Sequence, residues 1–525
     1  MKHGVDPDIM TEDSRSLLHL AAFAGHLETV NYFCKFHPRL CKLCDVDGNS
    51  VLHDAAAGGD IGVFQKLLET GADPRTPNND GATVLHDAAF YGRFNIVKHI
   101  CLTYPELLDT LSRSGLTAAI GAALGGHVNI IEYLENEGTD LTVQTLEGST
   151  ALHEASYAGE LEMVKHLCNR FPVMQEVRNK RSFMPFHFAA QEGHLDVLRY
   201  LLSERIGPTG MLPVTEGCQT ILHISAYNGM MDVVKYICTK FPSLLPCKDS
   251  EGALALHYAA RGGYIQTLDY LIDKGHDPES TTESGSTILH LAAFDGNLNM
   301  VTHICELIPD LVSNLDNSGH TAAHYAAGSG KIPVLMNILK YGVDPMIQAE
   351  NGSTLLMKAA GSGRVSMVKY LCSEYPDMLL IKDYCGCDML HYAACGGSID
   401  ILKLGIDNDL DPLSISAEEH TLLHVATFHN KLNVVLFLSE CYPEMIDTVD
   451  ATQKTPHDIA IELGHGRISA VFQQKKNACT PKTDDTVQDT NGALADVFCM
   501  VERANCGGCK SVWGALIRTV CFCRK

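Results

Sequence analysis

The sequence lacks any long uninterrupted hydrophobic run. Its first residues, MKHGVDPDIMTEDS, contain no apolar stretch of the kind a signal peptide needs, and no segment reaches the roughly 18 apolar residues of a membrane-spanning helix. The longest candidate, VWGALIRTVCFC near the end of the chain, is too short and contains Arg518. We therefore expect an intracellular, cytoplasmic protein whose 20 cysteines are mostly reduced.

Positive charge is also scarce, with 40 Lys and Arg against 63 Asp and Glu, which gives a net charge of −23. The shortage is uneven, because residues 503–525 contain five basic residues and no acid, which leaves −28 on residues 1–502. A phosphate backbone would be repelled by most of the chain, so nucleic acid is not an expected partner. The basic closing segment, by contrast, would be attracted to negatively charged groups.

What the sequence does contain is a repeat with the pattern T-x-L-H-x-A-A. Its histidines are His19, His53, His86, His153, His187, His223, His257, His290, His324, His391 and His424. Three further copies carry Ile120, Met357 and Asp458 in place of the histidine, which makes fourteen copies. Each copy continues with a glycine turn and a second segment of apolar residues at helical spacing, so the pattern predicts helix, turn, helix and hairpin.

These motifs resemble the ankyrin repeat family, over about Gly4 to Gln474. The predicted fold is an all-α ankyrin-repeat solenoid, in which stacked helix pairs share one continuous core. The threonine is expected to cap the first helix, and the resemblance implies that the histidine bridges backbone groups of adjacent hairpins. It also implies protein recognition along the concave face and the hairpin tips.

The histidine positions are not evenly spaced. A longer step, as from His19 to His53, alternates with one that is shorter by one residue, as from His53 to His86. The true unit is therefore a double repeat of sixty-seven residues, the step from His19 to His86.

Every odd copy except the last has a cysteine in the second helix: Cys34, Cys101, Cys168, Cys238, Cys305 and Cys372, with Ser439 in the last copy. A proline follows four residues later. Copies two repeats apart cannot share a metal site, so these cysteines are interpreted as small buried apolar residues.

No Ser/His/Asp, Cys/His or metal-ligand arrangement stands apart from the repeat. We therefore expect no enzyme activity, no cofactor and no small-molecule substrate.

Two irregularities interrupt the array. The step from His187 to His223 is the longest and places three extra residues at 206–212, which predicts a loop or a slight hinge. At the start, Gly4 to Ser16 matches Gly342 to Thr354, so the first copy is incomplete. Leu17 and Leu18 are therefore expected to face solvent on one side. The natural product is expected to extend upstream. Residues 1–474 thus form the predicted array, closed by a more polar last copy that resembles a family end cap.

An aromatic residue recurs near the end of the first helix in the odd copies: Phe23, Phe90, Tyr157, Tyr227, Phe294 and Phe428. Even copies add an aromatic just after the histidine: Phe188, Tyr258, Tyr325 and Tyr392. Aromatic residues are enriched at binding hot spots, so these ten are candidate partner-binding residues. The alternative is that each packs against the next first helix and binds nothing. The acidic array favours basic or amphipathic segments of partner proteins.

The end of the chain differs from the array. Residues 475–498 are rich in Thr, Asp and Asn and predict a polar linker, and residues 499–525 form a basic tail with cysteines. Trp513, Leu516, Ile517 and Val520 lie on one stripe of a short predicted helix, which favours contact with an anionic membrane surface.

Cys506, Cys509, Cys521 and Cys523 are candidates for S-acylation, which is the favoured interpretation. A zinc site on the same four cysteines is the rival, and an unmodified tail is the third possibility.

The function predicted from the sequence is a non-enzymatic interaction scaffold or adaptor, tethered to membranes if the tail is acylated. A second hypothesis makes the array the recognition arm of a larger enzyme or channel whose N-terminal part is missing from this sequence.

Overall fold

The computed structural model describes residues 8–203 and 212–479. Within these ranges the chain forms 28 α-helices and seven short 3₁₀ helices, and its only extended pairing is two isolated bridges, Met10 with Ser16 and Cys44 with Ser50. The predicted all-α solenoid is confirmed. The three extra residues around 206–212, and with them the expected hinge, lie almost wholly outside the described residues.

Each copy contributes two α-helices. The first helices are α1 (Leu17–Phe23), α3 (Val51–Gly58), α5 (Val84–Phe90), α7 (Ala118–Leu124), α9 (Ala151–Ala158), α11 (Pro185–Glu192), α13 (Ile221–Tyr227), α15 (Ala255–Gly262), α17 (Ile288–Asp295), α19 (Ala322–Ser329), α21 (Leu355–Gly361), α23 (Met389–Gly396), α25 (Leu422–Phe428) and α27 (Pro456–Glu462). The second helices are α2 (Leu27–Phe36), α4 (Ile61–Glu69), α6 (Phe94–Thr103), α8 (Val128–Asn136), α10 (Leu161–Arg170), α12 (Leu195–Ser203), α14 (Met231–Lys240), α16 (Ile265–Asp273), α18 (Leu298–Leu307), α20 (Ile332–Lys340), α22 (Val365–Glu374), α24 (Ile399–Asp407), α26 (Leu432–Cys441) and α28 (Gly466–Cys479).

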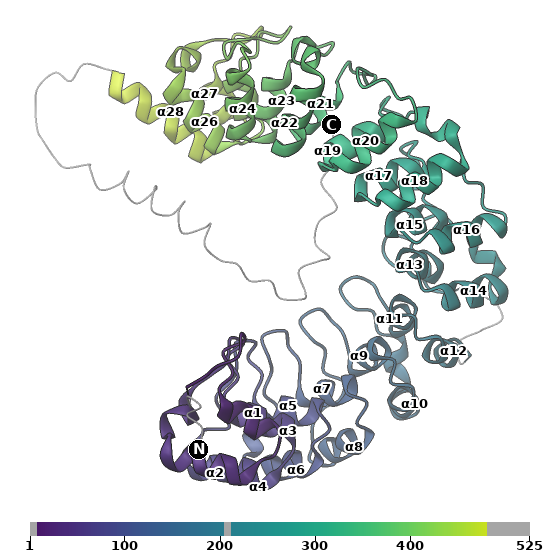
Figure 1. Cartoon of the computed structure of the whole chain (residues 1–525), viewed down its shortest axis with the longest axis vertical. Helices are drawn as coiled ribbons and strands as arrows, with labels where there is room; N and C mark the ends of the chain where they lie inside the picture. Colours follow the sequence, from purple (N-terminus) through teal and green to yellow (C-terminus); the bar gives the residue numbers. More distant parts are fainter. Residues whose placement is uncertain (1–7, 204–211, 480–525) are drawn as a thin grey trace, which may run out of the picture.

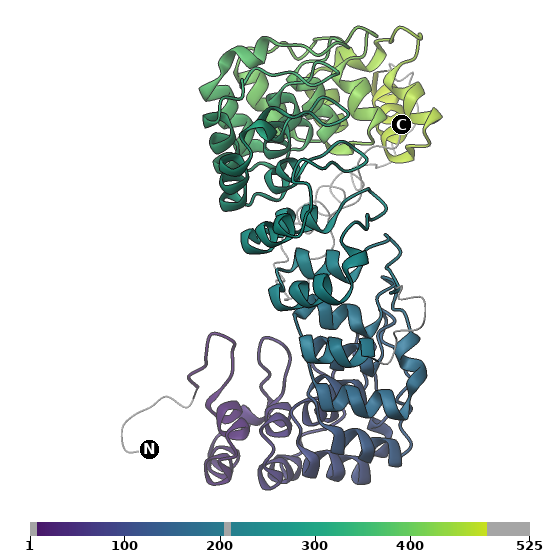
Figure 2. The same ribbon diagram turned by 90° about the vertical axis from the view of Figure 1, so that its right-hand side faces the viewer.

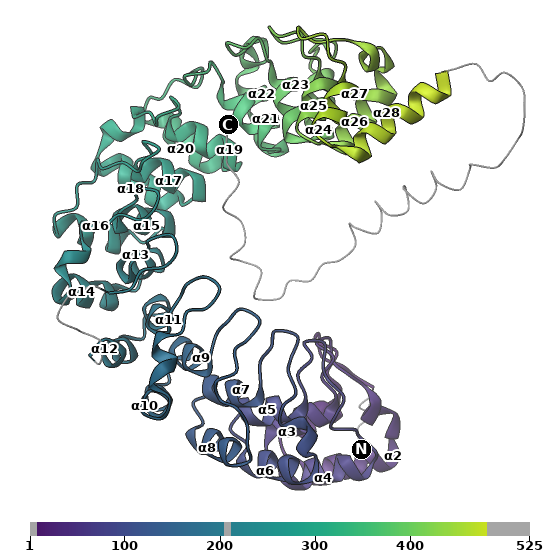
Figure 3. The ribbon, with the colours of Figure 1, turned by 180° about the vertical axis from the view of Figure 1, so that it is seen from behind.

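The copies stack into a long curved arc (Figure 1). First helices such as α5, α7, α13 and α15 line the inner side of the curve, and second helices such as α6, α8, α14 and α16 form its outer side. The arc is open on one side, where α2 and α28 stand apart at its two ends, as the views from the side and from behind also show (Figures 2 and 3).

Histidines in eight of the copies form a bridge to the copy that follows. The backbone N–H of Thr150 donates to Nδ1 of His153, 3.1 Å away, and the Nε2 atom of His153 lies 3.1 Å from the carbonyl oxygen of Phe183 in the following hairpin. The same bridge, with Nε2 to carbonyl distances of 3.0 to 3.3 Å, is made by His53, His86, His223, His257, His290, His391 and His424. The bridging role implied by the resemblance is confirmed for eight of the eleven histidines.

The two kinds of copy end differently after the second helix. In odd copies a proline opens a 3₁₀ helix: η1 (Pro38–Lys42), η2 (Pro105–Leu107), η3 (Pro172–Glu176), η4 (Pro242–Leu244), η5 (Pro309–Ser313), η6 (Pro376–Leu380) and η7 (Pro443–Asp447). In the second, fourth, eighth, tenth and twelfth copies the chain instead turns through a left-handed residue, which is glycine at Gly71, Gly138, Gly275 and Gly342. Asp409 takes this conformation in the twelfth copy, with φ of 64°. The double repeat therefore has a structural counterpart.

The core runs along the whole array between the two helix layers. Cys101, Cys168, Cys238 and Cys305 are buried in it, and Cys34 and Cys372 are half-buried, as expected for small apolar residues. The expectation for Leu18 was wrong, because this side chain is fully buried and Leu17 is half-buried. Packing of α1 against α2 and α3 covers both leucine side chains. The exposed apolar residues of the first copy are other side chains.

Candidate partner-binding surface

The ends of the first helices are held in place by the copy that follows. Their last carbonyl groups have no partner within the helix, and side chains that follow the next copy's glycine turn supply donors. Nε2 of His127 lies 3.0 Å from the carbonyl oxygen of Phe90, and Nε2 of His194 lies 2.9 Å from that of Tyr157. Arg93 donates to Ala57 in the same way, at 2.7 Å. The predicted aromatic residues therefore stand at fixed positions on the inner helix layer.

These end aromatics differ in exposure. Phe23, Phe90, Tyr227 and Phe428 are exposed, with 41%, 38%, 39% and 56% of their surface accessible, whereas Tyr157 and Phe294 are half-buried. A large exposed aromatic side chain on a monomer's surface is available to a partner.

In the middle of the array the two predicted sets of aromatics touch each other. Tyr157 meets Phe188, Tyr227 meets Tyr258, and Phe294 meets Tyr325, all edge to face with ring centroids 6.2 to 6.4 Å apart. Each pair joins an odd copy to the even copy after it. In the eleventh copy the aromatic is replaced by Gly361, and a side chain there would come within 3.3 Å of the Tyr392 ring.

The tyrosines of the even copies also brace their own hairpins. Their hydroxyl groups donate to an aspartate nine residues earlier: Tyr258 to Asp249 at 2.7 Å, Tyr325 to Asp316 at 2.9 Å, and Tyr392 to Asp383 at 2.9 Å. Burial, together with the neighbouring carboxylate, raises the pKa of Tyr258 and of Tyr392. Much of the surface and hydrogen-bonding capacity of these tyrosines is thus used within the array.

Near the N-terminal end the aromatics cluster differently. The rings of Phe23 and Phe90 each lie edge to face with Tyr91, at 6.3 and 5.0 Å between centroids. The guanidinium of Arg15 sits 5.5 Å from the centre of the Phe23 ring. Tyr91 is 44% exposed and was not among the residues predicted from the sequence. We call Phe23, Phe90 and Tyr91 the N-terminal aromatic cluster.

Acidic side chains accompany this cluster. The position after the histidine is Asp54 in the second copy and Asp87 in the third. Burial raises the pKa of Asp54 to about 6, opposed by its ion pair with Arg15, and raises the pKa of Asp87 to about 7. Burial also raises the pKa of Glu154 at the same position of the fifth copy. The inner helices of the early copies therefore carry partly desolvated carboxylates that favour a positive charge nearby.

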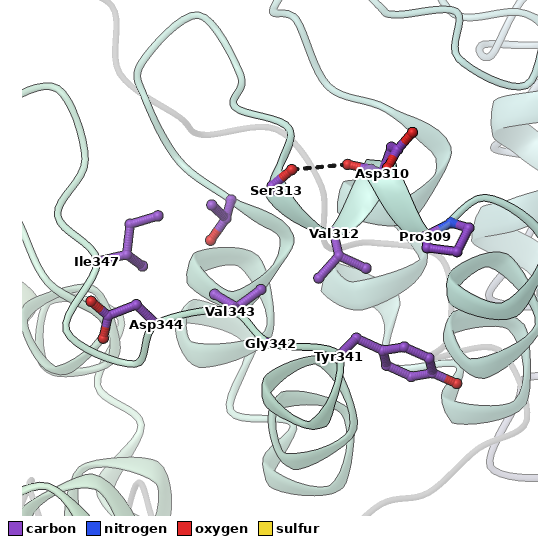
Figure 4. Close-up of a pocket in the computed structure, with 10 residues that line it drawn as sticks. Pro309, Asp310, Val312, Ser313, Tyr341, Gly342, Val343, Asp344 and Ile347 are labelled. Atoms are coloured by element: carbon purple, nitrogen blue, oxygen red, sulfur yellow. Dashed lines mark hydrogen bonds between the residues drawn. The ribbon is translucent and has the colours of Figure 1, made fainter.

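A shallow pocket of about 230 Å³ lies between η5 and the end of α20, where the side chains of Val312 and Val343 face the same space (Figure 4). Its ionisable lining consists of Asp310, Asp344 and the phenol of Tyr341. Over residues 8–203 and 212–479, no three His, Cys, Asp or Glu side chains are grouped closely enough to hold a metal ion.

No helix within the described part of the chain is long and apolar enough to cross a membrane. Helix α28 extends to Cys479, and the remainder of the chain from residue 480 lies outside the described residues. The tail candidates for acylation or zinc, Cys506, Cys509, Cys521 and Cys523, and the membrane-contact candidates Trp513, Leu516, Ile517 and Val520, belong to that part and stay predictions.

Comparison with known proteins identifies relatives of several kinds. The chain is 24% identical over 243 residues to Palmitoyltransferase AKR1 of Lachancea kluyveri, covering 44% of this chain and 32% of that protein. It is 24% identical over 438 residues to human Transient receptor potential cation channel subfamily A member 1, covering 74% and 39%, and 28% identical over 379 residues to Ankyrin repeat and KH domain-containing protein mask-1 of Caenorhabditis elegans, covering 68% and 14%.

The chain thus spans about a third of the length of the first two relatives and less of the third. A model of three ankyrin repeats matches it in overlapping segments that run without a gap from residues 1–78 to residues 329–414, and α25 to α28 continue the same architecture beyond them. With its bridging histidines and its stacked helix pairs, the chain belongs to the ankyrin repeat family.

Proposed function

We propose that this protein is a non-enzymatic scaffold in the cytoplasm that binds partner proteins on its inner helix layer, chiefly at the N-terminal aromatic cluster. The exposure of Phe23 at the end of α1, and of Phe90 and Tyr91 at the end of α5, with their rings in contact across the intervening copy, is the observation that carries the proposal. Three neighbouring aromatic rings offer a large apolar area at a small cost in side-chain entropy.

The charge around the cluster indicates the chemistry of the partner. Asp54, which pairs with Arg15, and the half-buried Asp87 lie on the same helix layer as the aromatics. An amphipathic segment with apolar residues and one or more basic residues would cover the rings and approach these carboxylates. The net charge of −28 on residues 1–502 would also accelerate the encounter with a basic segment.

The experiment compares proteins captured by the full chain in cells, by proximity labelling and quantitative mass spectrometry. The test variant carries Phe23→Ala, Phe90→Ala and Tyr91→Ala, and the matched control carries Tyr32→Ala and Phe36→Ala, two exposed aromatics on the outer helix α2. We expect the test variant to lose specific partners at least tenfold, because aromatic hot spots contribute about 2 kcal/mol or more each. Equal loss in both variants, or no loss in either, would contradict the proposal.

A second candidate function is that the array forms the recognition arm of a larger protein. It is favoured by one observation: a palmitoyltransferase and a cation channel each align to this chain over only about a third of their own length. Sequencing the complete transcript from its 5′ end tests the candidate. A coding region for a catalytic or membrane domain in the same frame supports it, and an in-frame stop shortly before Met1 contradicts it.

For the tail we propose reversible membrane attachment through S-acylated cysteines. Each basic residue near an anionic surface contributes about 1 kcal/mol, and a single lipid chain anchors only marginally, so both features are needed together. Fractionation of the wild type beside a variant with Cys506, Cys509, Cys521 and Cys523 changed to serine tests this. Release from membranes by the substitution and by hydroxylamine is expected, and a wild type that never sediments with membranes would rule the anchor out.

A further inference from the structure

The first copy contains two thiols in direct contact. The Sγ atom of Cys34, in α2, is 3.5 Å from the Sγ atom of Cys41, in η1. Both side chains are half-buried, and neither is part of a disulfide. A disulfide bond is about 2.05 Å long, so the two sulfurs need to approach by only about 1.5 Å to form one.

The repeat pattern shows that this pair is particular to the first copy. A cysteine recurs at the Cys34 position in five other odd copies, whereas the residues that stand seven positions later, where the first copy has Cys41, are Leu108, Gln175, Leu245, Val312 and Leu379. In the first six odd copies the 3₁₀ helix opened by the proline contacts the second helix of its own copy. The same backbone arrangement thus holds a thiol pair in one copy and a thiol beside another side chain in the rest.

The surroundings make Cys41 the more reactive of the two thiols. Its pKa is lowered to about 7, first by its hydrogen bond with the Cys34 thiol and then by its interaction with Thr70, against the opposing effect of burial. The pKa of Cys34 is raised, first by its bond to Cys41 and then by burial. The thiolate is the nucleophilic form of cysteine, so Cys41 is suited to attack and Cys34 to resolve.

We propose that Cys34 and Cys41 form a redox modification site that is oxidised by peroxides to a reversible disulfide. The Cys41 thiolate attacks one oxygen of hydrogen peroxide, an S–O bond forms, the O–O bond breaks, and the departing hydroxide takes a proton to become water. The Cys34 thiol then gives up its proton and attacks the sulfenic sulfur, an S–S bond forms, and the S–O bond breaks as hydroxide leaves with that proton as a second water. The two thiols lose two electrons to the peroxide, and a small thiol reductant reverses the change by exchange.

The sequence makes the product easy to identify. Trypsin cleaves after Lys35, Arg39 and Lys42, so Cys34, Cys41 and the exposed neighbour Cys44 fall on three separate peptides, residues 16–35, 40–42 and 43–66. The full chain is treated with hydrogen peroxide at pH 7, alkylated, digested without reductant and mapped by mass spectrometry. We expect peptide 16–35 linked to peptide 40–42, formed at least tenfold faster than any modification of Cys101, and lost after dithiothreitol.

Two variants serve as matched controls because the chain already contains their side chains at equivalent places. Cys41→Leu introduces the residue that other odd copies have at the equivalent position, Leu108 and Leu245. Cys34→Ser introduces the residue that the last odd copy has at its equivalent position, Ser439. Both are expected to fold, to melt within a few degrees of the reduced wild type, and to form no bridge. With Cys34→Ser, sulfenic acid at Cys41 should become trappable by dimedone.

Several outcomes would overturn the proposal. The first is a disulfide that joins Cys34 chiefly to Cys44. The second is conversion of Cys41 to the sulfinic acid in the wild type without any disulfide. The third is a reactivity of Cys41 toward peroxide no greater than that of the exposed Cys44.

Discussion

The second and third copies differ from the sixth to twelfth copies at the position that follows the histidine. The early copies have the acids Asp54 and Asp87 there, and the even later copies have Phe188, Tyr258, Tyr325 and Tyr392. In the later copies these aromatics contact the end aromatic of the preceding copy or, for Tyr392, the glycine in its place. In the early copies Phe23 and Phe90 instead lie edge to face with Tyr91 and all three rings are exposed, whereas Tyr227, which is exposed to a similar degree, meets Tyr258.

The comparison teaches that one sequence feature serves two purposes. An aromatic at the end of a first helix stabilises the stack where the next copy supplies a second aromatic, and it is left for a partner where the next copy supplies an acid or a glycine. We therefore expect substitutions in the later copies to change stability first, and substitutions in the early copies to change binding first.

The largest effect on stability is expected from Tyr258→Ala. The variant removes a buried ring, its contacts with Tyr227 and His223, and the hydrogen bond to Asp249. Loss of a buried aromatic costs about 3–5 kcal/mol. Urea denaturation followed by circular dichroism measures the change, and Tyr91→Ala is the matched exposed control, for which less than about 1 kcal/mol is expected. Equal destabilisation by the two variants would contradict the expectation that the aromatics of the later copies contribute more to stability than those of the early copies.

Acid is expected to affect the two regions differently. The buried histidines of the later copies have pKa values lowered by burial, to about 4 for His257 and to about 3 for His324. The fold holds them neutral, so their contribution to stability is complete above pH 6.5 and is lost as the pH falls toward 4. The pH dependence of stability has the opposite sign for Asp54 and Asp87. Their raised pKa values of about 6 and about 7 make the fold more stable as the pH falls from 7 toward 3.8.

Hydrogen exchange at pH 7 and pH 5, corrected for the intrinsic rates, measures this difference copy by copy. We expect protection to fall more in α15 and α19 than in α3 and α5. A uniform loss along the array would show that the acids of the early copies do not compensate for the histidines.

A smaller effect is expected when only the hydroxyl group is removed. Tyr325→Phe keeps the ring contact with Phe294 but deletes the hydrogen bond to Asp316, which also accepts backbone N–H groups from Ser318 and His320. Hydrogen bonds to charged groups contribute about 1.5–3 kcal/mol when no other donor is available, so we expect about 1–2 kcal/mol here. A thermal melt of the variant that matches the wild type would show that the tyrosine acts through its ring alone.

The smallest effect is expected from Asp87→Asn. A neutral side chain removes the cost of a buried charge, so at pH 8 the variant should gain about 1 kcal/mol in the free energy of unfolding, and at pH 5, where Asp87 is already protonated in the fold, the gain should be small. Asp249→Asn is the matched control, because it weakens the acceptor of the Tyr258 hydroxyl and should destabilise at both pH values. A gain that does not depend on pH would contradict the assignment for Asp87.

The sequence was sufficient for everything that repeats. The caps, the bridging histidines, the buried cysteines and the alternation of proline and glycine endings could be predicted because each recurs at one helical position in successive double repeats. The partners of the aromatics could not be predicted, because contacts such as that of Tyr227 with Tyr258 join different copies and depend on the spacing between helices.

Two errors of detail have the same origin. Tyr91 is not among the predicted residues because the aromatic that recurs in the odd copies is the residue before it, although both rings are exposed at the end of α5. Leu18 was expected to face solvent because the first copy begins in the middle of a repeat, whereas its side chain is fully buried in the core. Neither fact can be read from one copy alone.

The alternation of endings also determines how such an array can change in length. The aromatic contacts of Tyr157, Tyr227 and Phe294 are all made inside one double repeat, and a double repeat begins and ends with the same kind of boundary. Removing or adding one whole double repeat would keep the proline and glycine endings in alternation. Removing a single copy would place two proline endings, or two glycine endings, next to each other. The reach of this protein, measured along its axis, is therefore adjustable in steps of two copies.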